Sequence, residues 1–214
     1  GNLTSYVRDE RGNVTKITYP DRGVEQFEYD EKNHCIYHKD QAGVVTRFEY
    51  DESGNLLRKI VELDSNVSYS EGADPAKFAI TTYTYYQTGE TGSSCKGLVK
   101  QVTTPEGSVT TYEYDAYGNQ TGIANHFGDV TRYEYDEIGR VTKQKTPEGV
   151  VTEYFYDKNG RLTKNVLAGA ETTEVRYNEQ GLVEKEIRSG YSQTSEYSYP
   201  YDSLGNLETS TDAL

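Results

Sequence analysis

Residues 133–143 read YEYDEIGRVTK, and this stretch decides the fold. Tyr133 and Tyr135 alternate with Glu134, so a β-strand would place both rings on one face and the carboxylate on the other. Asp136 and Gly139 follow at the first and fourth positions of a turn. This spacing predicts a type I turn followed by a left-handed glycine, the three-residue hairpin loop with a bulge. The basic stretch RVTK is then expected to return as the second strand.

The same pattern recurs along the chain, because Tyr114, Tyr135, Tyr156 and Tyr177 follow one another at steps of 21 residues. Repetition at a fixed period indicates stacked copies of one supersecondary unit. The predicted structural motif comprises Tyr29, Asp30, Tyr50, Asp51, Gly54, Tyr114, Asp115, Gly118, Tyr135, Asp136, Gly139, Arg140, Tyr156, Asp157, Gly160, Arg161, Tyr177 and Gly181.

A second turn lies between successive copies of the first. Residues 104–107 and residues 146–149 both read TPEG, which places proline where its fixed φ suits a turn and glycine at the end. Two turns per period leave two strands of about seven residues each. The sequence therefore predicts an all-β fold of tandem antiparallel β-hairpins, about 21 residues each, that form an extended curved sheet.

The phase of the repeat breaks in two places, over a long stretch after Asp51 and again between Asn178 and Asp202, where the step of 24 residues predicts a longer loop. Asp51 and Asp115 are 64 residues apart, and few clean motifs lie between them, although the alternation in residues 83–85 (YTY) indicates a strand. We therefore expect one array over 1–214 with N-terminal repeats in 1–63, an irregular insertion with degenerate repeats in 64–100, and C-terminal repeats in 101–214.

Opposite charges on successive strands are expected to hold the sheet in register. Acidic strands such as residues 133–135 (YEY) precede basic return strands such as residues 140–143 (RVTK), and cross-strand ion pairs and aromatic contacts contribute about 0.2 to 1 kcal/mol each. The return strands alternate less cleanly, so the sequence leaves their faces unassigned.

Composition excludes several classes of function. The 214 residues carry a formal net charge of −13, which disfavours nucleic acid and anionic membranes as partners. The hydrophobic fraction is 34%, with 21 Tyr, 5 Phe and no Trp, a balance that suits half-wet sheet faces better than a thick dry core. No stretch is apolar enough for a membrane span, and the start at Gly1 leads us to expect a segment of a longer polypeptide.

The motif resembles that of the Rhs/YD-repeat family. Residues 135–141 (YDEIGRV) and 156–162 (YDKNGRL) match the family's Tyr-Asp-x-x-Gly-Arg-Leu consensus, and weaker copies cover nearly the whole chain. The resemblance implies a single YD-repeat array that is part of a YD-shell or barrel. In bacterial Rhs proteins and toxin-complex subunits such shells enclose a C-terminal toxin, whereas in teneurins a similar barrel belongs to an adhesion ectodomain. The aspartate-containing self-cleaving core that closes many bacterial shells has no matching motif here. The resemblance therefore implies that this chain forms part of the shell wall and not its cap.

The sequence gives little support for a catalytic site or a metal site. Glu28, Glu49, Glu113 and Glu134 recur in successive repeats, as expected of a solvated face, whereas a glycosidase pair should occur once in a concave pocket. The aspartates beside glycines already have a role in the turns, so a calcium loop is disfavoured. A strand would also separate His34 from Cys35 onto opposite faces, so we expect no catalytic, cofactor-binding or metal-binding residues. The sequence is compatible both with a disulfide between Cys35 and Cys95 and with two separate thiols.

These observations favour a non-enzymatic structural scaffold: a wall segment of a YD-repeat shell in a secreted or cell-surface bacterial protein, which encloses or presents a toxin or effector. The alternative is a carbohydrate- or protein-binding surface module, because rows of Tyr can stack on sugars, although they can equally pack on one another. The expected partners are the rest of the parent polypeptide and an enclosed toxin domain, or a glycan under the alternative, with no nucleic acid and no cofactor. Open strand edges also predict weak edge-to-edge self-association.

Overall fold

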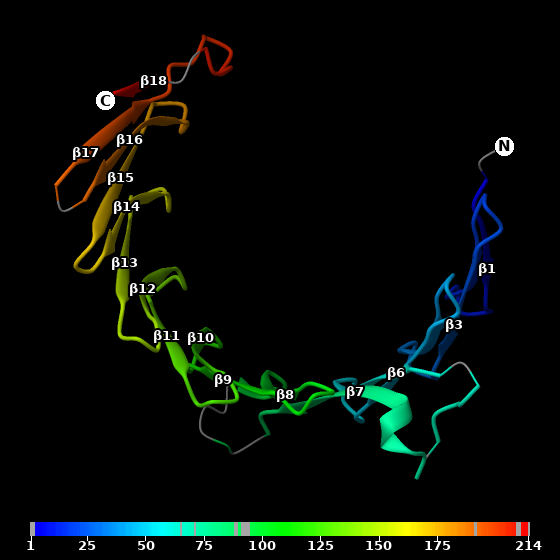
Figure 1. The fold of residues 1–214 in the computed structure, drawn as a ribbon. Coiled ribbons are helices and arrows are strands. Elements are labelled where there is room, and N and C mark those ends of the chain that lie inside the picture. Colours follow the sequence, from blue (N-terminus) through cyan, green and yellow to red (C-terminus); the bar gives the residue numbers. More distant parts are fainter. Residues whose placement is uncertain are drawn as a thin grey trace. The chain divides into compact units, whose positions relative to one another are not determined.

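The computed structural model describes residues 3–64, 66–70, 72–87, 90, 95–190, 192–208 and 211–213. It divides into two units, of which unit 1 comprises residues 1–112 with 116–118 and unit 2 comprises residues 113–115 with 119–214. Within the described ranges the regular elements are β-strands, apart from 3-10 conformation at Pro75–Lys77 and at Cys95 (Figure 1). The all-β fold predicted from the alternation of residues is therefore confirmed.

Each strand pairs antiparallel with the next along the chain within a unit. The strands of unit 1 are β1 (Ser5–Arg8), β2 (Val14–Thr18), β3 (Val24–Tyr29), β4 (Cys35–Lys39), β5 (Val45–Tyr50), β6 (Leu56–Glu62), β7 (Phe78–Tyr85), β8 (Val99–Thr103) and β9 (Val109–Tyr114), the last two residues of which belong to unit 2. Those of unit 2 are β10 (Gln120–Ala124), β11 (Val130–Tyr135), β12 (Val141–Lys145), β13 (Val151–Tyr156), β14 (Leu162–Leu167), β15 (Glu171–Tyr177), β16 (Val183–Ser189), β17 (Thr194–Ser198) and β18 (Thr211–Ala213).

The hairpin turns have the geometry that the sequence predicts. The Gly139 amide donates to the Asp136 carbonyl at 3.0 Å, the Asp136 amide donates to the Arg140 carbonyl at 2.9 Å, and Gly139 has φ of +81°. The register of β11 and β12 shifts between Glu134 and Tyr135, as a bulge requires. The second type of turn is built the same way, since the Gly149 amide donates to the Thr146 carbonyl at 2.9 Å.

Most of the described strands are shorter than the predicted length of about seven residues, although β6, β15 and β16 have seven residues and β7 has eight. β12 and β13 have 5 and 6 residues, because residues 136–140 and residues 146–150 lie outside the strands. Each turn thus takes five residues of the period, and the closing bond between Asp136 and Arg140 accounts for the difference.

The register assigns both faces of the return strands. Tyr133 lies opposite Gln144, which lies opposite Thr152, whereas Glu134 lies opposite Lys143, which lies opposite Glu153. Residues directly opposite one another share a face. We call the side of β11–β15 that bears Tyr133 the tyrosine face and the other side the charged face.

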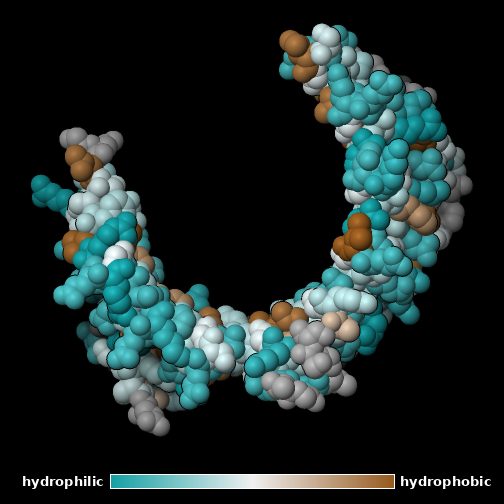
Figure 2. Space-filling model, turned by 180° about the vertical axis from the view of Figure 1, so that it is seen from behind, coloured by the Kyte–Doolittle hydropathy of each residue, from teal (hydrophilic) through white to brown (hydrophobic). Residues whose placement is uncertain are grey.

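Each unit is a single layer over most of its length, and its extensive strand contacts are those between consecutive strands. Figure 2 shows hydrophilic residues over most of the visible surface, with hydrophobic residues as isolated spots. Among the described residues, no helix has the length and apolar character needed to cross a membrane.

One stretch of unit 1 does have a buried core. Ile60 is 0% exposed and Phe78 is 6% exposed, on the sheet side where Ile60 pairs with Arg47 and Glu62 pairs with Phe78. The loop after β6 returns over this side, because the Tyr69 ring meets the Phe78 ring edge-on at 5.3 Å. The Glu62 Oε1 atom fastens the loop, since it accepts from the Tyr69 amide at 3.1 Å and from Arg47 Nε at 2.8 Å.

Candidate functional site: the tyrosine–aspartate turns

The motif aspartate organises each turn through both of its oxygens. Asp136 Oδ1 accepts from the Ile138 amide at 3.1 Å and the Arg140 amide at 2.9 Å, while its Oδ2 accepts from Arg140 Nε at 2.6 Å. Asp157 repeats the arrangement with Arg161 at 2.7 Å. A tight turn leaves amides that the strand ladder does not pair, and the carboxylate satisfies them. The Arg140 amide and guanidinium outweigh the partial burial of Asp136 and hold its pKa below the ordinary value.

The residue after the glycine is the constant partner of this carboxylate. Where it is Asn, the side-chain Nδ2 donates to Oδ2 of the turn's own aspartate, at 3.0 Å for Asn13, 2.8 Å for Asn55, 2.9 Å for Asn119 and 2.9 Å for Asn206. His34, which follows Asn33 in place of the glycine, contacts Asp30 at 2.9 Å through Nδ1. The motif predicted from the sequence includes Arg140 and Arg161 but omits the asparagines and His34 at the same position of other turns. These residues differ in type, and what they share is a side chain that can donate a hydrogen bond to the aspartate.

The motif tyrosine links each repeat to the preceding one. Its hydroxyl donates to the main-chain carbonyl of the first residue of the preceding return strand, an interaction that we call the tyrosine clasp. The clasps are Tyr29 to Val14 at 3.1 Å, Tyr50 to Cys35 at 2.9 Å, Tyr85 to Leu56 at 2.8 Å, Tyr135 to Gln120 at 2.7 Å, Tyr156 to Val141 at 2.7 Å and Tyr177 to Leu162 at 2.8 Å.

The clasp closes a gap that the strand ladder leaves. β12 and β13 pair from Lys145 and Val151 to Lys143 and Glu153 and no further, so the carbonyl of Val141 lies beyond the last pair. The Tyr156 hydroxyl bonds to this carbonyl. Burial of the side chain raises the pKa of Tyr156, which keeps the hydroxyl protonated as a donor.

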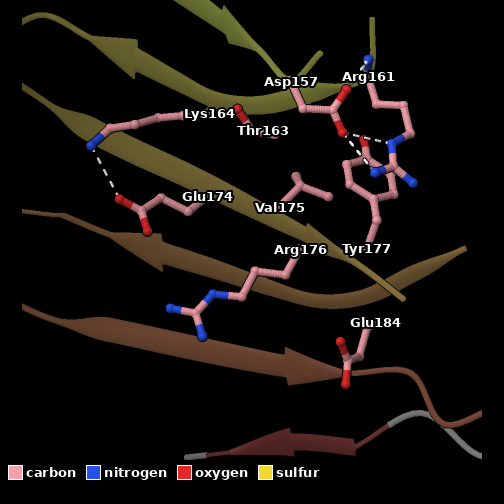
Figure 3. A pocket seen from close by; sticks show the side chains of 9 residues that line it. All are labelled: Asp157, Arg161, Thr163, Lys164, Glu174, Val175, Arg176, Tyr177 and Glu184. Atoms are coloured by element: carbon pink, nitrogen blue, oxygen red, sulfur yellow. Dashed lines mark hydrogen bonds and ion pairs between the residues drawn. The ribbon is translucent and has the colours of Figure 1, made fainter. Parts of the chain in front are cut away.

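A stacked side chain reinforces the clasp in unit 2. The Arg140 guanidinium lies 4.6 Å from the centre of the Tyr156 ring, and that of Arg161 lies 4.4 Å from the centre of the Tyr177 ring. Figure 3 shows Arg161 between Asp157 of its own turn and Tyr177 of the next repeat. In unit 1, the His34 ring stacks on Tyr50 at 4.8 Å in the same position. One turn is thereby joined to the next repeat by hydrogen bonds and ring contacts together.

The structure gives each type of motif residue a distinct place. Five of the motif tyrosines (Tyr29, Tyr50, Tyr135, Tyr156 and Tyr177) form clasps, and Tyr114 ends β9. The aspartates Asp30, Asp51, Asp115, Asp136 and Asp157 accept turn amides. The glycines Gly54, Gly118, Gly139, Gly160 and Gly181 have positive φ. The motif omits Tyr85, because Tyr86 and not aspartate follows it.

The diverging strand ends leave a shallow groove in each unit. The groove between β14 and β15 has a volume of about 550 Å³ and is lined by Asp157, Arg161, Thr163, Lys164, Glu174, Val175, Arg176, Tyr177 and Glu184 (Figure 3). The groove between β4 and β5, of about 480 Å³, includes Asp30, Ile36, Phe48 and Tyr50 at the corresponding positions. Lys164 forms an ion pair with Glu174 at 3.1 Å, and Arg161 forms one with Asp157, so these charged side chains of the groove are paired with each other.

The other residues considered as sites have structural partners. His38 Nε2 contacts Glu25 at 3.1 Å, and no disulfide joins Cys35 and Cys95, both of which the structure describes. Within the described ranges, no three His, Cys, Asp or Glu side chains gather as a metal site. Three of the four recurring glutamates form ion pairs, at 3.3 Å from Glu49 to Arg58, 2.7 Å from Glu113 to Arg132 and 3.7 Å from Glu134 to Lys143.

The fold and the turns together define an array of YD-type β-hairpins. The model of the Teneurin YD-shell family matches residues 3–163, and the chain belongs to this family. No curated protein matches the chain.

Several solved structures contain a similar fold. The crystal structure of TcdB2-TccC3-Cdc42 aligns with a TM-score of 0.70 at 18% identity over 97% of this chain and 12% of that one. The structure of TcdB2-TccC3 without its hypervariable C-terminal region gives 0.64 at 17% identity over 95% and 12%. The Photorhabdus luminescens Tc holotoxin pore gives 0.55 at 15% identity over 97% and 13%. The chain thus spans about an eighth of these structures, and the likeness shows the fold alone.

Proposed function

We propose that this chain is a wall segment of a YD-repeat shell that encloses or presents a toxin or effector. The observation that carries the proposal is the recurrence of one interlock, aspartate turn plus tyrosine clasp, in both units. An interlock that recurs in successive repeats serves the continuity of the sheet, whereas a reactive site needs a unique constellation of residues.

The similar structures support this assignment. The name of one of them describes a Tc holotoxin pore, and the family is named for a shell. Because the chain spans about an eighth of those structures, the payload, the bacterial source and the secreted or cell-surface location are parts of the proposal.

The contacts of the motif side chains favour a scaffold over an enzyme and over a carbohydrate module. The hydroxyls of six tyrosines donate to main-chain carbonyls, and the motif aspartates are held by turn amides. These hydroxyls already have partners inside the sheet, so a sugar would have to compete with an intramolecular bond for each of them.

Protection of the payload in the full-length parent polypeptide tests the proposal. The variant with Tyr135→Phe and Tyr156→Phe loses two clasps, and the matched control with Tyr83→Phe and Tyr133→Phe loses two hydroxyls from the neighbouring aromatic position of the strands. We expect limited proteolysis to release the payload faster in the first variant than in the control or the parent. A payload that is cleaved at the same rate with and without the YD-repeat region would contradict enclosure.

A further inference from the structure

Asn159 and Gly160 stand at the tip of the turn that joins β13 to β14, and both are exposed. They form the only Asn-Gly pair in the sequence. Such a pair carries both groups of an intramolecular reaction, because the glycine amide nitrogen can attack the asparagine side-chain carbonyl carbon and close a five-membered ring. Glycine has no side chain to hinder the approach. The tip of this turn is therefore the place to look for a chemical modification.

The intact turn engages the groups that would have to move. The Gly160 amide donates to the Asp157 carbonyl at 3.0 Å, and the Asn159 amide donates to Asp157 Oδ1 at 2.9 Å. The Gly160 nitrogen can attack only after it has lost its proton and its bond to Asp157, and after the backbone of the turn has rotated. Local opening of the turn must therefore precede the reaction, so the contacts of Asp157 suppress it.

The next turn of the same type provides a natural comparison. Gln180 and Gly181 take the same two places between β15 and β16, where the Gly181 amide donates to the Asn178 carbonyl at 3.0 Å. Gly160 and Gly181 both have φ of +84°. Glutamine has one more methylene than asparagine, so the same attack would have to close a six-membered ring, which is far slower. The other turns of this type have no side-chain amide at this place, where they carry Arg11, Lys32, Ser53, Tyr117, Ile138 and Leu204.

We propose that Asn159 is a self-modifying site, and that its deamidation permanently opens the interlock between the turn after β13 and the next repeat. The Gly160 nitrogen forms a bond to the Asn159 side-chain carbon, the bond from this carbon to the side-chain nitrogen breaks, and that nitrogen leaves as ammonia. The proton of the Gly160 amide passes to the solvent, which supplies the proton that ammonia takes up. Water then opens the cyclic imide at either carbonyl and gives aspartate or isoaspartate, with no oxidant or reductant involved.

Isoaspartate would break the turn because it adds one carbon to the main chain. The bonds from the Gly160 amide to the Asp157 carbonyl and from the Asp157 amide to the Arg161 carbonyl, at 2.9 Å, fit a loop of fixed length. Their loss frees Arg161 from Asp157 Oδ2, which it contacts at 2.7 Å, and from the Tyr177 ring, 4.4 Å away (Figure 3). Isoaspartate does not revert to asparagine, so the opening proceeds in one direction.

Mass spectrometry of the 214-residue chain during incubation at mildly alkaline pH tests the proposal. Peptide mapping follows the replacement of the Asn159 amide by an acid, and enzymatic methylation quantifies isoaspartate. A short peptide of residues 154–164 measures the reaction without the fold. We expect Asn159 to react about tenfold more slowly in the folded chain than in the peptide, and about threefold faster in Asp157→Ala than in the parent chain. The matched control Asp51→Ala, in unit 1, should react as the parent does, and Gln180 should stay intact throughout.

Hydrogen exchange of the purified isoaspartate form provides the second readout. Exchange at the Gly160 and Arg161 amides should be several-fold faster than in the unmodified chain, with β17 unchanged, which separates an opened turn from an unfolded unit. Three outcomes would overturn the inference: an Asn159 that stays intact in the folded chain while the peptide converts, a rate that Asp157→Ala does not raise, or an isoaspartate form that exchanges as the unmodified chain does.

Discussion

The covered stretch of β6 and β7 and the bare repeats of β11–β15 stabilise the same type of sheet in different ways. Under the returning loop, Ile60 is fully buried, Phe78 nearly so, and the buried Glu62 is held by two donors. The described residues of β11–β15 include no fully buried hydrophobic side chain, and there the aspartate turns and tyrosine clasps recur without such a core, whereas the covered stretch has both the core and the Tyr85 clasp. The comparison teaches that a one-layer sheet can replace burial by many small polar contacts, repeated once per period.

The largest expected effect is a loss of stability when the buried core of the covered stretch is disrupted. Ile60→Ala should lower the free energy of unfolding of unit 1 by about 3 kcal/mol, because it leaves a cavity under the loop. Val166→Ala, at a half-buried position of β14, should cost about 1 kcal/mol or less. Urea unfolding followed by far-ultraviolet circular dichroism measures both. Equal losses would show that burial is not what distinguishes the two regions.

Removal of one motif carboxylate should loosen the bare repeats locally. Asp157→Ala removes the acceptor of the Asn159 and Arg161 amides, and hydrogen exchange at these two amides should become several-fold faster. Asp157→Asn keeps an oxygen for these amides and loses the ion pair with Arg161, so its effect should be smaller. If both variants exchange as the parent does, the carboxylate does not hold the turn.

Loss of one clasp is expected to have a smaller effect. Tyr156→Phe removes the bond to the Val141 carbonyl and should lower the free energy of unfolding of unit 2 by about 1 kcal/mol. Tyr133→Phe removes a hydroxyl from the adjacent aromatic position and should be close to neutral. Thermal unfolding of the two variants beside the parent separates a clasp from a generic tyrosine hydroxyl.

Acid should weaken the aspartate turns. The pKa values of Asp51, Asp136 and Asp157 are depressed in the folded state, by the Asn55 side chain and amide for Asp51 and by the amides and guanidiniums of Arg140 and Arg161 for the other two. A depressed folded pKa gives stability that is present above the unfolded pKa, near 4, and is lost as the pH falls through the folded value. Unfolding temperatures measured from pH 6 to pH 2 should fall less in Asp136→Asn with Asp157→Asn than in the parent.

The smallest expected effect concerns the exposed edge of unit 1. All four residues of β1 are exposed, including Tyr6 at 57% and Val7 at 54%, and β1 pairs with β2 on one side. We expect weak self-association of the isolated chain through this edge, which Val7→Lys should reduce. Sedimentation velocity at rising concentration tests it, and a strict monomer at high concentration would contradict the expectation.

The period, the two turns and the all-β fold were predictable because they depend on local chemistry: aspartate and glycine at fixed offsets, and aromatic residues that alternate with glutamate. The faces of the return strands were not, since the bulge between Glu134 and Tyr135 shifts the register and only the paired strands reveal it. The role of Asn55 and His34 beside their aspartates was hidden for a related reason, because the position demands a donor and not one residue type. The core around Ile60 depends on where a loop returns, which no local pattern contains.

The central claim is that the tyrosine clasp ties each repeat to the one before it. Native-state hydrogen exchange of unit 2 in the parent chain and in Tyr156→Phe tests this most directly. We predict faster exchange around the clasped ends of both β12 and β13, with little change in β16 and β17. Exchange that is unchanged at both ends, or raised equally throughout the unit, would contradict the claim.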